Sequence, residues 1–510
     1  MLQIEHVTLV HKKDLRTIID DFSFVLNRGD KAVLAGEEGN GKSTLLKWIY
    51  DPGLIESYAE AEGIRTARGE VMAYLPQELS GPDRQKTVSE YISGLRACDA
   101  DDVQAVSRIA AALQTDPDLL FSDRRMDTLS GGERVKVQMA GLLMMQPDIL
   151  LLDEPTNDID IETLEWMERF IREWQGSVLF VSHDETLIER TANRVILIEQ
   201  LRRKTVPRVT VANTTFDVFM AERRRAFAKQ EQEAQSDRRE KRKRDEKFRR
   251  IQQKVEKALQ NVSRQDPATG RLLKKKMKAV KSLEHRYERE SADMTERPEE
   301  EEAVNIRFNR QMAMPAGKTV LDMNIPQLVS KGGDVLAEGL ELRVRGPEKV
   351  CIIGPNGCGK TTFMKSIAEE LLSRTDIKAC YMPQDYEDLL PADISAVEFL
   401  APSGKKEDIT LARTYLGSLK FTRDEMLHPA GELSGGQKAK LLLLGMSLKE
   451  TDVLILDEPT RNLSPLTAPE VRAMLRDFPG AIISVSHDRK YIKEVCGTVY
   501  RMTENGLIRQ

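Results

Sequence analysis

Residues 36–43 read Gly-Glu-Glu-Gly-Asn-Gly-Lys-Ser and residues 354–361 read Gly-Pro-Asn-Gly-Cys-Gly-Lys-Thr, so one glycine-rich pattern occurs twice in this chain of 510 residues. Each copy is followed by Leu-Ser-Gly-Gly, at 129–132 and 433–436, and then by Asp-Glu-Pro-Thr. In both copies, 23 residues separate the serine of the first segment from the aspartate of the second, and a histidine follows 30 residues later. Equal order and equal spacing indicate an internal duplication.

A loop of the form Gly-x-x-x-x-Gly-Lys-Ser/Thr between a strand and a helix binds phosphate through its backbone N–H groups, and its glycines allow the close approach. Lys42 and Lys360 are expected to reach the β- and γ-phosphates, and the hydroxyls of Ser43 and Thr361 are expected to bind Mg²⁺. We therefore predict two loops that bind ATP and Mg²⁺. The other loop residues expected to bind the nucleotide are Gly36, Gly39, Gly41, Thr44, Gly354, Gly357, Gly359 and Thr362.

Two carboxylates follow an apolar run in each copy. Asp153 and Asp457 each end an expected strand and are predicted to hold the metal ion. Glu154 and Glu458 come directly after them and can orient or deprotonate the attacking water. Two glutamines are expected near the metal or that water, and two histidines near the γ-phosphate; these are Gln77, Gln384, His183 and His487. The set predicts hydrolysis of ATP to ADP and phosphate.

The complete set of motifs resembles the nucleotide-binding domains of the ATP-binding cassette superfamily. The resemblance implies that Leu-Ser-Gly-Gly begins a helix whose N-terminus faces the γ-phosphate of a nucleotide held by the opposite domain. ATP would then join the two halves, hydrolysis would release them, and both sites would be competent because both glutamates are present. Site 1 would pair the first phosphate loop with Ser434, Gly435 and Gly436, and site 2 would pair the second loop with Ser130, Gly131 and Gly132.

Three departures from the family pattern predict that the two sites differ in affinity. Glu38 stands where the family usually has Asn, and its negative charge near the phosphates would weaken nucleotide binding. Asp160, after the first Asp-Glu-Pro-Thr, occupies the position of Ser464 in the second copy. The family commonly stacks an aromatic residue on adenine; His11 holds this position in the first copy, and the second copy has no aromatic residue there.

The chain length suits two or three domains. Residues 1–205 and 302–510 alternate short β-rich runs with helical stretches, which is typical of α/β domains with a largely parallel sheet. The expected strands include residues 31–35, 177–181, 349–353 and 481–485. We predict two tandem P-loop ATPase domains of the α/β class, joined by a long α-helical hairpin linker at 206–301.

The linker is poor in strand signals. Residues 217–262 contain neither Pro nor Gly, and apolar residues from Ile251 to Leu259 recur every four positions, which predicts a long helix. Pro and Gly then interrupt the pattern, and a second, basic helical stripe follows. Two helices joined by a short tip, at about 261–271, should pack as an antiparallel hairpin.

The linker also carries the positive charge of the chain. Residues 221–290 hold 24 Lys and Arg against 12 Asp and Glu, a net charge of +12, whereas the whole chain has −5. Such a segment is an electrostatic match for the phosphates of RNA. The sequence has no run of 18 apolar residues and begins without the pattern of a signal peptide, so a cytoplasmic protein is expected.

Tandem cassettes joined by a long basic helical linker resemble the F subfamily of ATP-binding cassette proteins, whose members act on ribosomes. The resemblance implies that the linker enters the tRNA exit site of the 70S ribosome, near the peptidyl-transferase centre, 23S rRNA and P-site tRNA. Only 53 residues separate Gln77 from Ser130, which leaves no room for the extra helical arm of the housekeeping members. Residues expected to contact rRNA or tRNA are Arg242, Lys243, Arg244, Arg264, Gln265, Arg271, Lys274 and Lys275.

Within this subfamily, the long linker and residues 460–465 resemble the antibiotic-resistance group. We therefore expect a ribosome-protection ATPase that repositions P-site tRNA and displaces drugs bound at the peptidyl-transferase centre. A housekeeping translation factor is one alternative, and a soluble ATPase subunit of an ATP-binding cassette transporter is an alternative of another class. We expect no membrane and no DNA partner, and a monomer whose own two cassettes pair.

Overall fold

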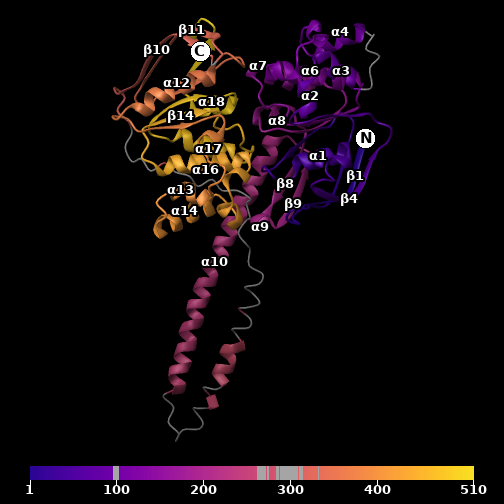
Figure 1. The fold of residues 1–510 in the computed structure, drawn as a ribbon. Coiled ribbons are helices and arrows are strands. Elements are labelled where there is room, and N and C mark those ends of the chain that lie inside the picture. Colours follow the sequence, from indigo (N-terminus) through magenta and orange to yellow (C-terminus); the bar gives the residue numbers. More distant parts are fainter. Residues whose placement is uncertain are drawn as a thin grey trace. The chain divides into compact units, whose positions relative to one another are not determined.

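The structure is a computed structural model that describes residues 1–95, 103–260, 271–272, 275–282, 287, 308, 314–330 and 332–510. The chain, coloured along its sequence in Figure 1, divides into two compact units. Met1–Phe216 and Glu301–Gln510 form one unit, and Asp217–Glu300 form the other, called here the linker unit. The first of these units holds both expected ATPase domains, called here the first and second domain.

The first domain is an α/β domain. Its strands are β1 (Leu2–His11), β2 (Thr17–Leu26), β3 (Lys31–Ala35), β4 (Ala59–Ala67), β5 (Met72–Leu75), β6 (Ile149–Asp153), β7 (Ser177–Val181), β8 (Arg194–Gln200) and β9 (Val206–Ala212). Its helices are α1 (Lys42–Tyr50), α2 (Gly81–Gln85), α3 (Val88–Gly94), α4 (Val103–Ala112), α5 (Pro117–Leu120), α6 (Gly131–Met144), α7 (Ile161–Glu173), α8 (Glu185–Thr191) and α9 (Leu201–Lys204).

A six-stranded sheet of order β5-β6-β7-β3-β8-β9 forms the centre of this domain. Its first five strands are parallel, and β9 pairs antiparallel with β8. The strands β3, β6 and β7 are buried at every residue, which explains their continuous apolar sequences. A second, antiparallel sheet has the order β2-β1-β4.

The second domain repeats this architecture. Its strands are β10 (Thr319–Val329), β11 (Val335–Arg345), β12 (Lys349–Ile353), β13 (Ala379–Met382), β14 (Val453–Asp457), β15 (Ala481–Val485), β16 (Thr498–Thr503) and β17 (Gly506–Arg509). Its helices are α12 (Lys360–Ser373), α13 (Ala396–Leu400), α14 (Lys406–Ser418), α15 (Arg423–Leu427), α16 (Gly435–Leu448), α17 (Ala468–Arg476) and α18 (Arg489–Val495). The sheet order β13-β14-β15-β12-β16-β17 matches that of the first domain strand for strand. The predicted pair of duplicated α/β domains with largely parallel sheets is confirmed.

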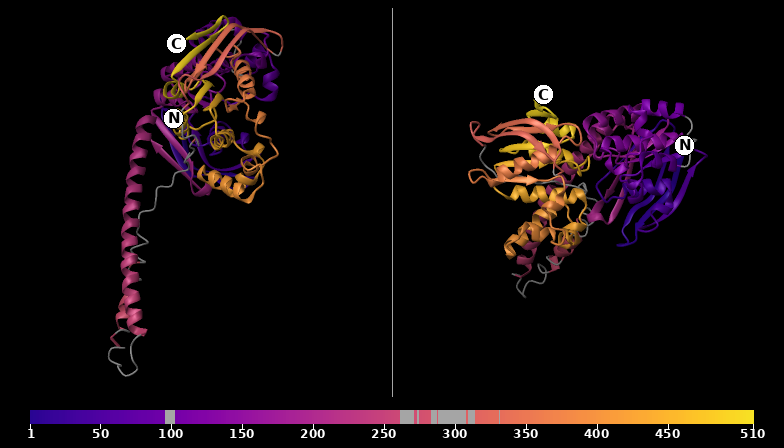
Figure 2. Two further views of the ribbon diagram at one scale, coloured as in Figure 1. Left: turned by 90° about the vertical axis from the view of Figure 1, so that its left-hand side faces the viewer. Right: turned by 45° about the horizontal axis from the view of Figure 1, so that its top comes forward.

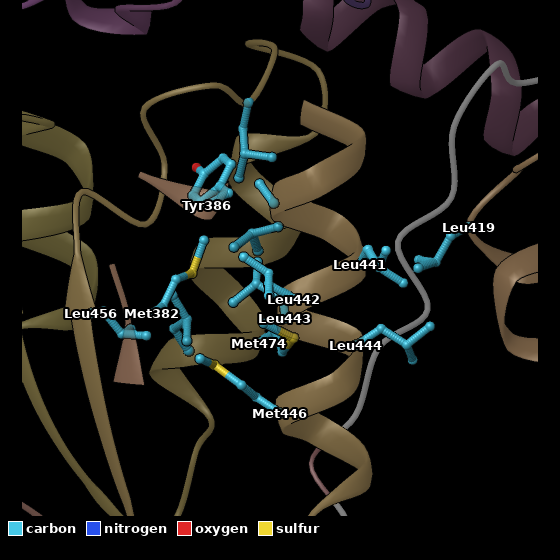
Figure 3. Close-up of a cluster of buried hydrophobic side chains, with 14 of the residues drawn as sticks. Met382, Tyr386, Leu419, Leu441, Leu442, Leu443, Leu444, Met446, Leu456 and Met474 are labelled. Carbon is cyan, nitrogen blue, oxygen red and sulfur yellow. The ribbon is translucent and has the colours of Figure 1, made fainter. Parts of the chain in front are cut away.

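The core of the second domain surrounds α16 (Figure 3). Leu441 and Leu443 are fully buried on this helix, and Met382, Leu456 and Met474 belong to the same cluster. Each fully buried aliphatic side chain stabilises the fold by roughly 1.5–3 kcal/mol. Because α16 begins within the second Leu-Ser-Gly-Gly segment, the helix that builds this core also fixes the position of that segment.

The linker unit contains one long helix, α10 (Phe216–Gln260), which is seen along its length in the left view of Figure 2. Residues 271–272, 275–282 and 287 are helical as well. Tyr287 lies edge-on to Phe248, with ring centroids 6.2 Å apart, and under the guanidinium of Arg244 at 4.7 Å. These contacts between residues about 40 apart in sequence fit the predicted antiparallel hairpin.

The sequence predicted that the first domain ends at residue 205. In the structure, the domain continues beyond that residue. β9 pairs with β8 from Val195 to Gln200, so the sheet continues to Ala212 before the long helix starts. The stretch 206–212 has few apolar residues, because β9 is the edge of the sheet and is only partly buried. Within the part of the chain that the structure describes, no helix is long and apolar enough to span a membrane.

Candidate active site

Both phosphate loops join a buried strand to a helix, the first between β3 and α1 and the second between β12 and α12. Gly41 and Gly359 precede the helices with φ values of +86° and +96°, in the left-handed region that favours glycine. A Cβ atom at Gly36 would lie 2.3 Å from the carbonyl oxygen of Ile198. The two loops therefore need their glycines, as a phosphate-binding loop does.

The loop lysines have matching geometry in the two domains. Nζ of Lys42 donates to the carbonyl oxygens of Gly36 (2.9 Å) and Glu37 (2.8 Å). Nζ of Lys360 makes the two corresponding bonds, also at 2.9 and 2.8 Å. Both ammonium groups are buried at the start of a helix, where a phosphate that enters the loop would meet them.

The predicted catalytic glutamates occupy equivalent, strained positions. Glu154 and Glu458 have φ values of +50° and +53°. Each backbone N–H donates at 3.0 Å to a carbonyl of the neighbouring strand, that of Val181 and that of Val485. Burial raises the pKa of each carboxyl to about 8. Left-handed backbone at a non-glycine residue is costly, so its presence twice at the same motif position indicates a functional constraint.

The two histidines lie beside these glutamates. Nε2 of His183 is 3.1 Å from Oε1 of Glu154, and Nε2 of His487 is 3.6 Å from Oε1 of Glu458. Burial, with the loop lysine of the same domain as the next cause, lowers the pKa of each histidine to about 4. Both imidazoles are thus neutral near pH 7, and each adjoins a glutamate that keeps its own proton below about pH 8 and accepts one from water only when it is ionised.

The two Leu-Ser-Gly-Gly segments form helix N-termini, as predicted. The hydroxyl of Ser130 accepts from the N–H of Glu133 at 3.2 Å, and Ser434 accepts from Gln437 at 3.3 Å. The side chains of Glu133 and Gln437 accept in return from the backbone N–H of the serines, so each helix starts with a capping box. These caps hold the first turns of α6 and α16 in one conformation.

Site 2 is assembled from both domains. A cavity of about 810 Å³ brings the second phosphate loop to the first Leu-Ser-Gly-Gly segment. This volume is in the range of small-molecule sites, about 300–1,000 Å³. Its predicted lining residues are Ser130, Gly131, Gly357, Gly359, Lys360, Thr361, Thr362, Gln384, Asp457, Glu458 and His487, together with His183, which was predicted for site 1.

The donor set of site 2 fits Mg²⁺. Neither carboxylate oxygen of Asp457 has a hydrogen-bond partner among the described residues, although the group is buried. The hydroxyl of Thr361 lies 3.4 Å from Oε1 of Gln384 in the same cavity. Hydroxyl, amide and carboxylate oxygens are the ligands that this hard cation prefers.

The corresponding groups of site 1 already have partners. Oδ1 of Asp153 accepts from the hydroxyl of Ser43 at 2.8 Å, and Oδ2 accepts from that of Tyr74 at 3.0 Å. Gln77, predicted near the metal, is exposed just beyond β5. Site 1 therefore has the hydroxyl and the carboxylate expected to bind Mg²⁺, but these two groups hydrogen-bond to each other.

The second Leu-Ser-Gly-Gly segment and the first loop line a much smaller cavity than the one at site 2. Ser434 and Gly436 line a cavity of about 40 Å³ together with Glu37 and Glu38. Gly435 lines another cavity, of about 410 Å³, beside Gln384. Glu38 was predicted from the sequence as a charge near phosphate, whereas Glu37 was not.

The other departures are also visible. Nδ1 of His11 lies 2.8 Å from Oδ1 of Asp14, and the ring is partly exposed. Asp160 caps α7 by accepting from the N–H of Thr163 at 2.9 Å. Leu336, which the sequence did not single out, lines the site 2 cavity and packs against Gly359. Of the remaining loop residues, Gly39 has a φ of +77°, Gly354 of +158°, and Thr44 is partly buried in the first turn of α1.

The predicted RNA-contacting side chains belong to the linker unit. Arg242, Lys243, Arg271 and Lys275 are exposed. Nε of Arg242 donates to Oε1 of Glu246 at 3.3 Å, and Arg244 is partly covered by Tyr287. The other three candidates, Arg264, Gln265 and Lys274, lie outside the described residues.

Comparison with known proteins gives the family. The family described as ABC transporter matches residues 19–157 and 337–461, once in each domain. The chain is 27% identical over 523 residues to the ATP-binding protein Uup of Escherichia coli (strain K12), covering 93% of this chain and 76% of that protein. It is 26% identical over 545 residues to ABC transporter F family member 5 of Arabidopsis thaliana, covering 96% and 73%.

A solved structure with a similar fold is that of the complex of archaeal ribosomal stalk protein aP1 and archaeal ribosome recycling factor aABCE1. The TM-score is 0.59 at 18% identity, covering 99% of this chain and 90% of that chain. This likeness concerns the fold, whereas the family model that matches both domains, over more than half of the chain, shows the family. The chain belongs to the ATP-binding cassette family as an ABC-F-type protein, and it hydrolyses ATP.

Proposed function

We propose that this ATPase binds the ribosome at the tRNA exit site, repositions P-site tRNA with its linker, and so displaces antibiotics bound at the peptidyl-transferase centre. The observation that supports this most strongly is the basic helical linker between two complete ATPase domains. The F family relative and the ribosome recycling factor of similar fold give the proposal its context.

The linker has the length and charge for this role. α10 has 45 residues, which is about 68 Å at 1.5 Å per residue. Exposed cations on it include Arg242, Lys243, Arg249 and Arg250. Lys and Arg that replace counterions on RNA phosphates provide most of the binding free energy of such surfaces, and they make it depend on salt.

The ATPase would control residence on the ribosome. ATP bound between the domains closes them into the form that fits the exit site, and Mg²⁺ held by Thr361, Gln384 and Asp457 would neutralise charge on the phosphates. Glu458 would take the proton of the attacking water while His487 orients the γ-phosphate. Hydrolysis then permits departure.

The first experiment traps the bound form. A variant with both Glu154→Gln and Glu458→Gln should remain on 70S ribosomes in the presence of ATP and should block translation, because closure occurs without hydrolysis. Sedimentation of ribosomes with and without ATP measures this. Release of the double variant from ribosomes in ATP would contradict the proposed cycle.

The linker surface needs its own test, with matched charges. Neutralising Arg242, Lys243, Arg249 and Arg250 to Gln should weaken ribosome binding and flatten its salt dependence. A control neutralises four exposed cations outside the linker and should bind as the natural protein does; these are Arg28, Arg68, Lys405 and Lys406. Equal losses of ribosome affinity in the two variants would show that the linker is not part of the binding surface.

A third experiment separates drug displacement from its alternatives. Expression in a drug-sensitive bacterium should raise the inhibitory concentration of drugs that bind the peptidyl-transferase centre, and leave unrelated drugs unaffected. Ribosome binding without any resistance would favour a housekeeping translation factor. Sedimentation with membranes rather than ribosomes would favour the transporter subunit.

A further inference from the structure

The two phosphate loops differ in the side chains that they direct at the opposite domain. Glu37 and Glu38 occupy the positions of Pro355 and Asn356. The first loop therefore brings two carboxylates to its site, where the second loop brings a pyrrolidine ring and an uncharged amide.

Glu38 occupies the N-terminus of α16. Its Oε2 accepts from the backbone N–H of Gly436 at 2.6 Å. A Cβ atom at Gly436 would lie 3.3 Å from that oxygen, so the glycine makes room for the carboxylate. The first N–H groups of a helix favour an anion, and in the natural reaction that anion would be the γ-phosphate. Here the protein supplies the anion itself.

Glu37 is bonded to the same domain by three side chains. Its Oε2 lies 3.2 Å from Nζ of Lys440, and its Oε1 accepts from the hydroxyls of Thr467, at 2.9 Å, and Ser464. Glu37 and Lys440 are both nearly buried. A buried charge that has both an opposite charge and hydrogen bonds is compensated, and removing one partner is costly.

The second loop makes a different contact. Nδ2 of Asn356 donates at 2.6 Å to the backbone carbonyl of Asp158, and the first turn of α6 lines the large cavity instead. The two cavities, about 810 Å³ at site 2 and about 40 Å³ at site 1, differ accordingly. The smaller cavity lies far below the range of small-molecule sites, about 300–1,000 Å³, whereas the larger one lies within it.

Contacts away from both sites also join the domains without a nucleotide. Arg472 is 3% exposed, and its guanidinium pairs with Glu185 at 2.5 and 3.1 Å. Arg489 pairs with Glu168 at 2.8 Å and with Asp184 at 3.1 Å. In these pairs the first domain supplies the acids and the second supplies the bases.

We propose that Glu37 and Glu38 form a latch that keeps site 1 joined without ATP, so that site 2 alone opens, binds ATP and turns it over. The latch takes the place of the γ-phosphate at α16 and determines which of the two sites serves as the ATPase. This inference rests on the proposed assignment of the two ATP sites and does not depend on the ribosome.

The test counts nucleotides on the purified full-length protein. Equilibrium binding of the non-hydrolysable analogue adenylyl imidodiphosphate, with Mg²⁺, should show one tight site per chain. Glu37→Gln with Glu38→Asn removes both carboxylates and should raise the affinity of the second site by about tenfold or more, because charge-assisted bonds to the protein no longer compete. A matched control, Glu60→Gln with Glu62→Gln, removes two exposed carboxylates of β4 and should leave one tight site.

A second readout follows the latch without nucleotide. Backbone hydrogen exchange at residues 434–437 should be slow in the natural protein and faster in the Glu37/Glu38 variant, while residues 130–133 should become protected only when the analogue is added. An intact circular dichroism spectrum of the variant separates this from unfolding. Two equally tight sites in the natural protein, or unchanged exchange at 434–437 in the variant, would overturn the latch. Neither result bears on ribosome binding.

Discussion

The first phosphate loop reaches the opposite domain with two carboxylates, and the second reaches it with the amide of Asn356. Behind the loops, the lysines have matching hydrogen bonds, and the glutamates have matching backbone angles and pKa shifts. Thus the side chains that touch the partner domain and the groups predicted to bind the metal distinguish the sites, whereas the loop lysines and the catalytic glutamates do not. Competence at such a composite site depends on the opposite domain as much as on the loop.

The largest expected effect is on turnover. Glu458→Gln removes the proton acceptor of site 2 and should lower steady-state ATPase activity by about 10²–10⁴-fold. Glu154→Gln changes site 1, which the latch keeps joined, and should lower the ATPase activity much less. Phosphate release by the two purified variants measures both effects, and the reverse order would contradict the assignment of site 2 as the working site.

The second largest effect is expected on stability, at the ion pairs that join the two domains without nucleotide. Arg472→Met leaves the buried carboxylate of Glu185 without its main partner and should destabilise the protein by about 3–5 kcal/mol. Arg476→Met, at a largely exposed arginine of the same helix, should change stability by less than about 1 kcal/mol. Denaturant unfolding measures the free energy of unfolding of both variants. Equal values would show that the ion pairs of Arg472 do not stabilise the joined domains.

Both sites should make the stability of the folded protein depend on pH. The reason is that both glutamates have a folded-state pKa of about 8 against an ordinary value of 4.5. The stability that depends on holding these protons is present below pH 4.5 and is lost as the pH rises through 8. Glutamine cannot lose a proton, so Glu154→Gln with Glu458→Gln should be more stable than the natural protein at pH 8, with the difference shrinking towards pH 4.5. Thermal unfolding without nucleotide or Mg²⁺ checks this; a difference independent of pH would contradict it.

The smallest effect concerns the metal carboxylates. Tyr74→Phe removes the 3.0 Å bond to Asp153 and should cost about 1–2 kcal/mol. Tyr381→Phe removes a buried hydroxyl that has no partner among the described residues, and should cost nothing measurable. Urea unfolding of the two variants distinguishes these results, and equal costs would mean that the two metal sites do not differ here.

Much of the fold could be predicted from the sequence because the central strands are unbroken apolar runs. The predicted runs 31–35 and 349–353 coincide with β3 and β12, since both are buried strands that end where a glycine-rich loop begins. The edge strand β9 escaped prediction because half-buried strands carry a weak hydrophobic signal.

The site was predictable where its chemistry is local and not where it depends on the partner domain. The glutamates and lysines follow from motifs with fixed spacing, whereas Glu37 binds residues more than 400 positions away, to which no motif points. The charge of Glu38 was apparent from the sequence. Its bond to Gly436 required the fold.

An experimental structure of the full chain with Mg²⁺ and adenylyl imidodiphosphate tests the difference between the sites most directly. We predict nucleotide density between Lys360 and Ser130, and the carboxylate of Glu38 still bonded to the N–H of Gly436. Nucleotide between Lys42 and Ser434, with Glu38 displaced from α16, would contradict the account.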